Sequence, residues 1–262
     1  MMTGSLVAIV TPMSADGAID HAAMRRLVDM HVDAGTDGLV VAGTTGESAT
    51  LTKPEHIALL AAAVEMAAGR IPIIAGTGSN STAQTIELSR EVDELGVQGF
   101  LVVTPYYNKP TQEGLEQHFS AVADAVSQPV MLYNVPGRTA VDLLPATVAK
   151  LAVHGNISGI KDATGDLSRV PQLRELCGAA FGLYSGDDAT SRAFMLAGGN
   201  GIVSVTANVA PAAMAALCRA AINGEAEKAE QIDAPLAALH RDLFLESNPI
   251  PVKWALERLG LI

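Results

Sequence analysis

Eight short apolar runs recur along the chain, and each is followed by Gly, Thr, Asn or Pro. Several are apolar and β-branched at successive positions, which is typical of a parallel strand that is covered on both faces. Each interval leaves room for one helix, as in a βαβ unit with a right-handed crossover. The runs begin near Leu6, Gly38, Pro72, Gly99, Pro129, Ile157, Phe181 and Gly201. Eight such units predict a closed (β/α)8 TIM barrel, which usually has about 250 residues.

Cap signals mark the start of several predicted helices. Asp20 is placed to cap one helix, and Thr52 with Glu55 three residues later has the form of a capping box. Comparable signals predict helices that begin at Ser81 and at Asp166. The alternative fold, an open doubly wound sheet, would carry a Gly-rich dinucleotide fingerprint after its first strand. This chain has no such pattern there, so the closed barrel is the better prediction.

The last part of the chain contains helical patterns only. They cover Pro211–Asn223, about Glu225–Asp242 and Pro249–Leu259. No Ser/Gly-rich linker separates them from the last apolar run. We therefore expect a barrel in residues 1–223 and a short helical C-terminal extension in residues 224–262.

The charge balance argues against nucleic acids and membranes as partners. Asp+Glu 28 against Lys+Arg 17 leaves a net charge of −11, which offers no basic surface for a phosphate backbone. Apolar stretches stop well before the ~20 residues that a membrane span needs, and no basic segment of the kind that opens a signal peptide precedes Leu6. Cys177 and Cys218 lie outside any CxxC pattern, as expected of reduced thiols in a cytoplasmic protein. The six dispersed histidines give no indication of a metal site.

Lys161 is the most informative residue at the predicted strand ends, where a barrel of this kind places its active site. It directly ends the apolar run that begins at Ile157, whereas the other lysines fall in predicted loops and helices. The two-residue period of a strand puts Lys161 on one face with Gly159 and Ile157. The amine could reach water and pair with Asp162, or it could be desolvated, attack a carbonyl and form an imine. The residues alone leave both interpretations open.

Tyr133 ends the strand before that of Lys161. Imine formation and hydrolysis move protons at every step, and a phenol held by neighbouring hydroxyls can carry them. The alternative is a tyrosine that packs at the end of the barrel with its hydroxyl in water.

Three further groups follow other strands. The turn Gly43–Glu47 offers two hydroxyls and free N–H groups for a carboxylate, or is simply a loop. Arg138 could clamp a carboxylate or form a surface ion pair. Asp187 and Asp188 argue against a phosphorylated substrate, and we expect them to cap the following helix.

Five motifs, in order, resemble the dihydrodipicolinate synthase family. They are Gly43–Ser48, Thr104–Asn108, Tyr133–Pro136, Gly159–Gly165 and Ser185–Asp188. The likeness extends from about Leu6 to about Leu259. It implies a lyase that condenses pyruvate with L-aspartate 4-semialdehyde to 4-hydroxy-tetrahydrodipicolinate, in diaminopimelate and lysine biosynthesis. It also implies a homotetramer built from tight dimers, with no metal or organic cofactor.

The resemblance assigns a role to individual positions. Lys161 corresponds to the Schiff-base lysine, and Tyr133 to the proton donor and acceptor. Thr44 relays protons from Tyr133 to Tyr107, which in the family reaches in from the neighbouring subunit. The positions that bind substrate are Thr45, the main chain at Val203, Arg138 at the entrance, and Gly186.

Lysine-inhibited members of the family bind lysine at the dimer interface. The corresponding positions here are Ser48, Ala49, Lys53, His56, Asn80, Gln84 and Tyr106. Gln84 stands where such members commonly have Glu, and a neutral contact is worth less than a charged one by roughly 1–2 kcal/mol. Lys53, where they often have His, adds a like charge. We therefore expect weak or absent inhibition by lysine. Relatives usually continue for one more helix, so we expect a C-terminal extension shorter than theirs.

Two other functions compete. A different pyruvate-dependent aldolase, such as N-acetylneuraminate lyase or a 2-keto-3-deoxy sugar acid aldolase, would share Lys161 and Tyr133. Arg138 and Tyr107 in their local motifs favour the synthase. A non-catalytic barrel would be expected to lose Lys161 or Tyr133, and this chain has both.

Overall fold

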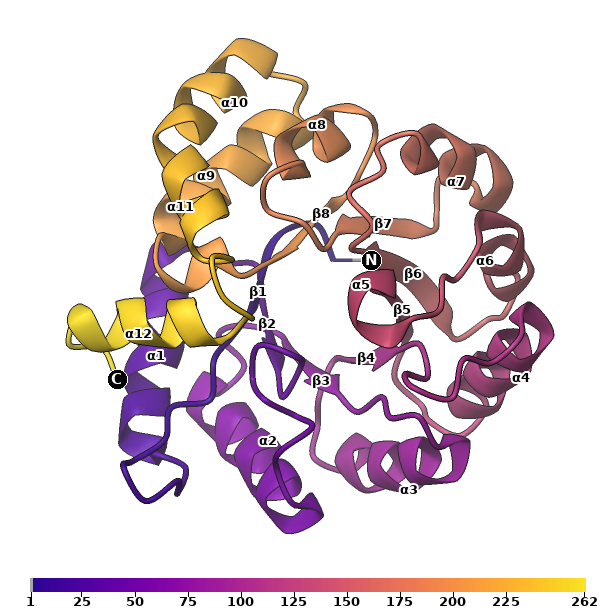
Figure 1. Cartoon of the computed structure of the whole chain (residues 1–262), viewed down its shortest axis with the longest axis horizontal. Coiled ribbons are helices and arrows are strands. Elements are labelled where there is room, and N and C mark those ends of the chain that lie inside the picture. The colour runs from indigo at the N-terminus through magenta and orange to yellow at the C-terminus, as the bar shows by residue number, and fades with distance from the viewer. Residues whose placement is uncertain (1) are drawn as a thin grey trace.

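The structure is a computed structural model that describes residues 2–262, and its centre is a closed barrel of eight parallel strands (Figure 1). The strands follow the chain order around the barrel, and β1 pairs with β8 to close it. Their bounds are β1 Gly4–Ala8, β2 Gly38–Val41, β3 Ile73–Gly76, β4 Gly99–Val103, β5 Val130–Asn134, β6 Ile157–Asp162, β7 Gly182–Ser185 and β8 Gly201–Ser204. The predicted (β/α)8 fold is therefore confirmed.

Helices surround the barrel. They are α1 His21–Ala34, α2 Lys53–Ala67, α3 Thr82–Asp93, α4 Gln112–Ala123, α5 Pro136–Thr139, α6 Pro145–Leu151, α7 Arg169–Cys177, α8 Ser191–Leu196, α9 Pro211–Ile222, α10 Ala226–Asp233, α11 Ala237–Asp242 and α12 Ile250–Arg258. Short 3₁₀ turns cover η1 Thr206–Asn208 and η2 Ala234–Leu236. Within residues 2–262, no helix is both long and apolar enough to cross a bilayer.

The apolar side chains form two layers, which is why the strands are apolar at successive positions. A small cluster fills the barrel interior: Leu6, Ala8, Val40, Ile74, Leu101, Met131, Tyr133, Tyr184 and Val203. A larger cluster lies between strands and helices and takes alternate strand residues such as Val7, Leu39 and Ile160. The filled interior leaves only the barrel ends available for a site.

The helix starts follow the local signals. Asp20 accepts a hydrogen bond from the N–H of Ala23, and Thr52 and Glu55 form the reciprocal capping box. Gly35 ends α1 at φ 74°, a left-handed conformation that glycine adopts without steric cost. α7 begins later than predicted, at Arg169, because the Asp166 carboxylate instead accepts from Ser168 in the preceding turn.

One predicted face was wrong. The register shifts between β5 and β6, so that Ile157 pairs with Val130 while Gly159 pairs with Met131. This irregularity breaks the two-residue period. Gly159 and Lys161 stay in register with the interior residues Met131 and Tyr133, but Ile157 packs in the outer layer.

The C-terminal helices lie on one side of the barrel (Figure 1), and Arg26 of α1 donates a hydrogen bond to the carbonyl of Leu261, which follows α12. The segment predicted as one helix over 225–242 is divided into α10, η2 and α11. Pro235 lies in the 3₁₀ turn because it cannot donate the hydrogen bond that a continuous helix needs. The division into a barrel up to residue 223 and an extension from residue 224 stays a prediction.

Candidate active site

Lys161 and Tyr133 lie side by side at the carboxyl end of the barrel. They are register partners on β6 and β5, with side chains turned to the interior. The Lys161 Nζ is 4.1 Å from the centre of the Tyr133 ring. Lys161 is 5% exposed and Tyr133 is 6% exposed. The amine and the phenol therefore share one largely dry site.

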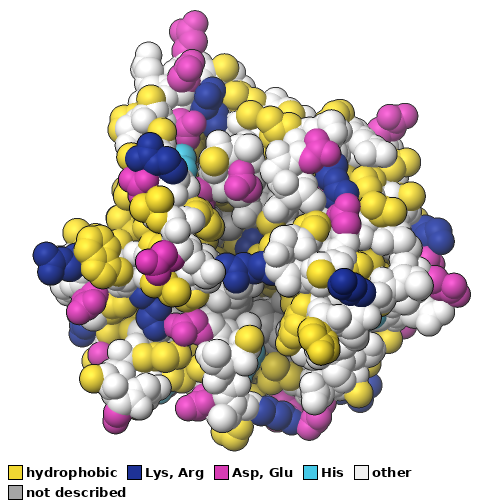
Figure 2. Space-filling view, viewed as in Figure 1, with side chains coloured by type: hydrophobic (Ala, Val, Ile, Leu, Met, Phe, Trp, Pro, Cys, Tyr) yellow, Lys and Arg dark blue, Asp and Glu magenta, His cyan; other side chains and the backbone are white. Residues whose placement is uncertain are grey.

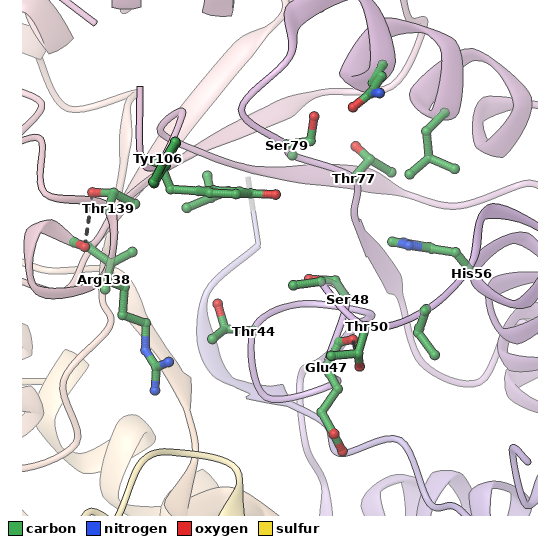
Figure 3. A pocket seen from close by; sticks show the side chains of 18 of the residues that line it. Thr44, Glu47, Ser48, Thr50, His56, Thr77, Ser79, Tyr106, Arg138 and Thr139 are labelled. Atoms are coloured by element: carbon green, nitrogen blue, oxygen red, sulfur yellow. Dashed lines mark hydrogen bonds between the residues drawn. The ribbon is translucent and has the colours of Figure 1, made fainter. Parts of the chain in front are cut away.

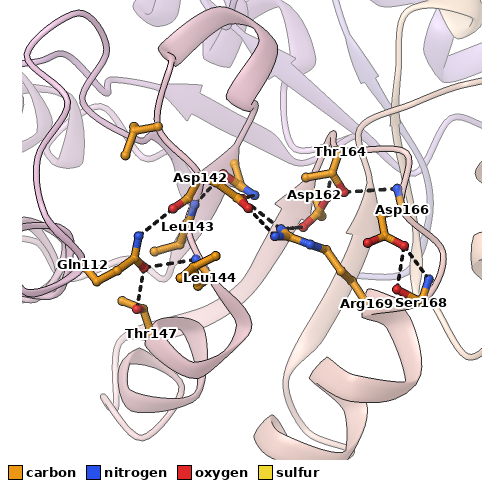
Figure 4. A network of polar contacts seen from close by, with 12 residues as sticks. Gln112, Asp142, Leu143, Leu144, Thr147, Asp162, Thr164, Asp166, Ser168 and Arg169 are labelled. Atoms are coloured by element: carbon orange, nitrogen blue, oxygen red, sulfur yellow. Dashed lines mark hydrogen bonds and ion pairs between the residues drawn. The ribbon is translucent and has the colours of Figure 1, made fainter.

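The predicted alternative, an ion pair between Lys161 and Asp162, is not formed in the described part of the chain. Asp162 turns to the outer side, where it accepts hydrogen bonds from the N–H and the hydroxyl of Thr164 and pairs with Arg169 (Figure 4). Arg169 also forms an ion pair with Asp142. These contacts satisfy the carboxylate next to Lys161 without its amine.

Gly186, after β7, makes room for the Lys161 side chain. A Cβ at this position would lie 3.0 Å from the Cε of Lys161 and 2.7 Å from the Cβ of Ala163. Such contacts would require a shift, since the second is shorter than real Cβ contacts allow. Val203, on β8, is 1% exposed and belongs to the interior cluster. Both residues thus lie near Lys161, and their predicted role in binding substrate stays a prediction.

The loop after β2 brings Thr44 and Thr45 to the same end. Thr11 fixes it by donating a hydrogen bond from its hydroxyl to the Gly46 carbonyl, at 2.7 Å. Among residues 2–262, the N–H groups of Thr44 and Thr45 have no protein acceptor. Thr45 is buried, and its hydroxyl oxygen accepts a hydrogen bond from the Asn248 amide at 2.9 Å. The loop therefore offers free donors, as a carboxylate site requires.

Arg138 lies in the short helix α5 above the barrel (Figure 1), and Figure 3 shows its side chain beside the loop of Thr44. Its guanidinium donates to the main-chain carbonyl of Asn248 at 3.0 Å. In the part of the chain that the structure describes, it pairs with no carboxylate. The surface ion pair considered for this residue is therefore absent there, and most of its donors remain available.

Tyr107 differs from the other predicted catalytic residues in its exposure, although it lines the same cavity as Thr44. It is 88% exposed and has φ 74°, an uncommon conformation for a bulky residue. No hydrogen bond joins the hydroxyls of Tyr133, Thr44 and Tyr107 within residues 2–262. The proposed relay is thus not assembled within one chain.

The two aspartates after β7 have different roles. Asp187 accepts hydrogen bonds from the N–H and the hydroxyl of Thr190, the residue before α8, but the predicted side-chain cap of that helix is not formed. Asp188 does not cap that helix. It is 2% exposed and accepts from the Ser204 hydroxyl and from the N–H of Val205 and Thr206, because the turn after β8 leaves these donors without partners. Burial raises the pKa of Asp188.

An open cavity of about 1190 Å³ extends outward from Thr44 and Arg138 between α2 and α3. Figure 2 shows the hollow near the middle of this face, with basic side chains at its edge. Six of the seven predicted effector positions line the cavity: Ser48, Ala49, Lys53, His56, Gln84 and Tyr106. The seventh, Asn80, is not among its lining residues in the described structure. We call the part between α2 and α3 the outer cavity, and Figure 3 shows His56, Thr77 and Ser79 there.

The charge predicted for Lys53 is largely offset. Its amine pairs with both Glu87 and Glu91, so the like charge toward a bound ammonium is smaller than expected. Burial lowers the pKa of His56, which bonds the Gly76 carbonyl at 2.8 Å. The argument for weak inhibition therefore rests on Gln84.

Asn248 was missed in the sequence. It lies 203 positions from its partner Thr45, and it precedes a predicted helix far from any strand end. The only local signal at this residue is its position before Pro249. No cluster of three or more metal-ligating side chains occurs in residues 2–262.

Comparison with known proteins places the chain among close relatives. The model of the Dihydrodipicolinate synthetase family matches residues 1–262. A 4-hydroxy-tetrahydrodipicolinate synthase of Shewanella sp. (strain W3-18-1) is 57% identical over 262 residues, which are 100% of this chain and 89% of that protein.

Solved structures agree with this result. The chloride-inhibited dihydrodipicolinate synthase of Acinetobacter baumannii, complexed with pyruvate, has a TM-score of 0.99 at 51% identity and covers 100% of this chain and 90% of its own. The enzyme of Cyanidioschyzon merolae with lysine bound has a TM-score of 0.96 at 39% identity, with 99% and 89% covered. The chain therefore belongs to the dihydrodipicolinate synthetase family.

Proposed function

We propose that this protein is a 4-hydroxy-tetrahydrodipicolinate synthase, a lyase that condenses pyruvate with L-aspartate 4-semialdehyde in lysine and diaminopimelate biosynthesis. The proposal rests mainly on Lys161. This residue is buried and has no carboxylate partner in the described residues, and its amine lies 4.1 Å from the Tyr133 ring centre. The name of the relatives and their pyruvate complex support the same reaction.

In the first step, the Lys161 nitrogen attacks the keto carbon of pyruvate. The resulting carbinolamine loses one water molecule and becomes an imine. Loss of a methyl proton then gives an enamine, whose carbon attacks the aldehyde of the second substrate. The aldehyde oxygen takes up a proton and becomes the 4-hydroxyl group. The amine of the adduct finally attacks the imine carbon, which closes the ring and releases Lys161.

Tyr133 moves the protons of these steps, because its phenol ring lies beside the amine, with its centre 4.1 Å from the Lys161 Nζ. Thr44 and Tyr107 continue the relay in the proposed mechanism. Tyr107 is 88% exposed in the single chain, and a second copy would bring this residue to the site of its neighbour. We therefore propose a working unit of at least a dimer, in a homotetramer.

Carboxylates orient both substrates. The hydroxyl of Thr45, with the main chain at Val203 and at Gly186, holds the carboxylate of pyruvate, and the free N–H groups of the loop add donors. Arg138 binds the carboxylate of the aldehyde, for which its planar guanidinium provides two parallel donors. No step of this sequence uses a metal or an organic cofactor.

Borohydride trapping tests the imine. The protein is incubated with pyruvate, reduced, digested and mapped by mass spectrometry. We expect one pyruvate-derived adduct, on the peptide that contains Lys161, and none on the peptides of Lys53 or Lys253. A protein that gives no adduct on Lys161 would exclude every imine mechanism at this site.

A substrate panel tests the second half of the reaction. Steady-state rates are compared for L-aspartate 4-semialdehyde, N-acetylneuraminate and 2-keto-3-deoxygluconate. We expect kcat/KM to be highest for the semialdehyde. A preference for either sugar acid would move the assignment to another aldolase.

We also propose that the outer cavity binds L-lysine weakly, through Ser48, Ala49, His56, Gln84 and Tyr106, with Lys53 and Asn80 nearby. The lysine-bound relative supports a site of this kind. The protein is proposed to act in the cytoplasm, where its free thiols Cys177 and Cys218 would stay reduced.

A further inference from the structure

Asn248 connects two groups that the proposed function assigns to different substrates. Its side-chain amide donates to the Thr45 hydroxyl oxygen at 2.9 Å, and its main-chain carbonyl accepts from the Arg138 guanidinium at 3.0 Å. The residue lies between α11 and α12, is 8% exposed, and lines the cavity that contains Thr44 and Arg138. A C-terminal residue therefore contacts both carboxylate-binding positions.

The contact with Thr45 constrains where that hydroxyl can donate. A threonine hydroxyl has one proton and two acceptor positions. Because the Asn248 amide occupies one acceptor position, the proton is left to point elsewhere, and no protein acceptor for it is found in residues 2–262. Accepting the hydrogen bond from Asn248 also polarises the Thr45 hydroxyl, which makes it a stronger hydrogen-bond donor. The amide thus prepares Thr45 to donate to an incoming carboxylate.

The other half of the amide makes no compensating contact. The Oδ1 of Asn248 is buried and has no hydrogen-bond partner in the described structure. Leaving a buried acceptor unpaired is unfavourable, so a small apolar residue would suit the folded chain better if packing alone mattered. The single bond that the side chain makes is the one to Thr45.

We propose that Asn248 is a positioning residue for pyruvate, which acts by holding the Thr45 hydroxyl ready for the substrate carboxylate. The inference rests on the proposed function, since it needs Thr45 to bind pyruvate. It also makes the C-terminal segment a part of the active site. The aldehyde should be affected much less, because Arg138 bonds the main chain of Asn248, which a side-chain substitution retains.

The test measures pyruvate binding without the aldehyde. The pyruvate concentration that gives half-maximal borohydride trapping on Lys161 is compared between the wild-type protein, Asn248→Ala and Asn248→Asp. We expect a rise of about fivefold to tenfold for Asn248→Ala, as for the loss of one hydrogen bond. A larger rise is expected for Asn248→Asp, since its carboxylate cannot donate and repels the carboxylate of pyruvate. The KM for the semialdehyde at saturating pyruvate should change less than about twofold in Asn248→Ala.

Two further variants separate positioning from simple support of the fold. Lys253→Met removes the ion pair between Lys253 and Glu47, which connects the same two segments at 2.6 Å without touching Thr45. We expect its pyruvate dependence to stay within about twofold of wild type. In a Thr45→Val background, Asn248→Ala should add no further loss, because its partner is already gone.

The outcomes are distinct. If the wild-type protein is trapped and both Asn248 variants keep its pyruvate dependence, the inference is wrong while the proposed function stands. Equal effects of Asn248→Ala and Lys253→Met would likewise overturn it. Should Asn248→Ala fail to fold, the equally sized Asn248→Asp decides. A wild-type protein without any adduct would overturn the proposed function and the inference together.

Discussion

Two lysines at the same end of the molecule have opposite environments. Lys161 in the barrel mouth is 5% exposed and has no carboxylate partner in the described residues. Lys53 in the outer cavity has a side chain that is 39% exposed and pairs with Glu87 and Glu91. The hydrogen bonds that Lys53 donates to Glu87 and Glu91 raise its pKa. A lysine is thus buried and unpaired at the end of the barrel, where it can react, whereas in the outer cavity its charge is offset by two carboxylates.

The difference shows that burial and pairing together decide the role of an amine. Lys53, Lys150, Lys228 and Lys253 each pair with a carboxylate. Lys109 is unpaired in the described structure but exposed. Lys161 alone, within residues 2–262, is both buried and without an acidic partner. An amine in this environment is available to a substrate carbonyl, whereas the amine of an ion pair is already engaged with its carboxylate.

Removing each amine should give the largest contrast. Lys161→Ala is expected to lower kcat at least about a thousandfold, since it removes the covalent intermediate. Lys53→Met should leave kcat within about twofold, because exposed ion pairs contribute little. Steady-state kinetics with both substrates measure the two effects, and circular dichroism confirms the fold. Comparable losses in the two variants would contradict the comparison.

Replacing the phenol that neighbours Lys161 should have the next largest effect. Tyr133→Phe is expected to lower kcat by about 10²–10⁴-fold, the usual contribution of a positioned proton carrier. Tyr184→Phe is the matched control: this tyrosine also lies in the barrel interior, but its hydroxyl donates to the Met2 carbonyl, at 2.5 Å. Burial raises the pKa of Tyr184 to about 12, so it stays a neutral hydrogen-bond donor. If both variants lose activity equally, Tyr133 has no special role in proton transfer.

Arg138 lies at the entrance between the two regions, and its proposed role in binding the aldehyde can be tested by substitution. Arg138→Ala should raise the KM for L-aspartate 4-semialdehyde about tenfold to a hundredfold, as expected for the loss of a charge-assisted contact. The pyruvate concentration for half-maximal trapping should stay nearly constant. An equal effect on both substrates would show that Arg138 acts on the fold of the site and not on the aldehyde.

The smallest effect concerns the outer cavity. L-lysine should inhibit weakly, and Gln84→Glu should lower the half-inhibitory concentration by about fivefold to thirtyfold, because a charged contact replaces a neutral one. Initial rates at increasing L-lysine concentration measure this directly. Inhibition of the wild-type protein in the tens of micromolar would contradict the expected role of Gln84.

Much of the barrel mouth was predictable from local patterns. Lys161 and Tyr133 each end an apolar run, and parallel strands bring such ends together at one edge. The outer cavity was less predictable. The pairing of Lys53 depends on Glu87 and Glu91 of another helix, α3, and no local signal indicates which side chains of two packed helices meet. Asn248 was missed for the same reason.

The order of strands and helices, the barrel and the Lys161–Tyr133 pair were determined by the sequence itself, because apolar periodicity and cap residues act over a few positions. The outward turn of Asp162, the place of Ile157 in the outer layer and the bond from Asn248 to Thr45 were decided only by the tertiary structure. Those features depend on strand register and on contacts between segments that are far apart in the sequence. Such contacts contribute free energy only after folding has brought the segments together.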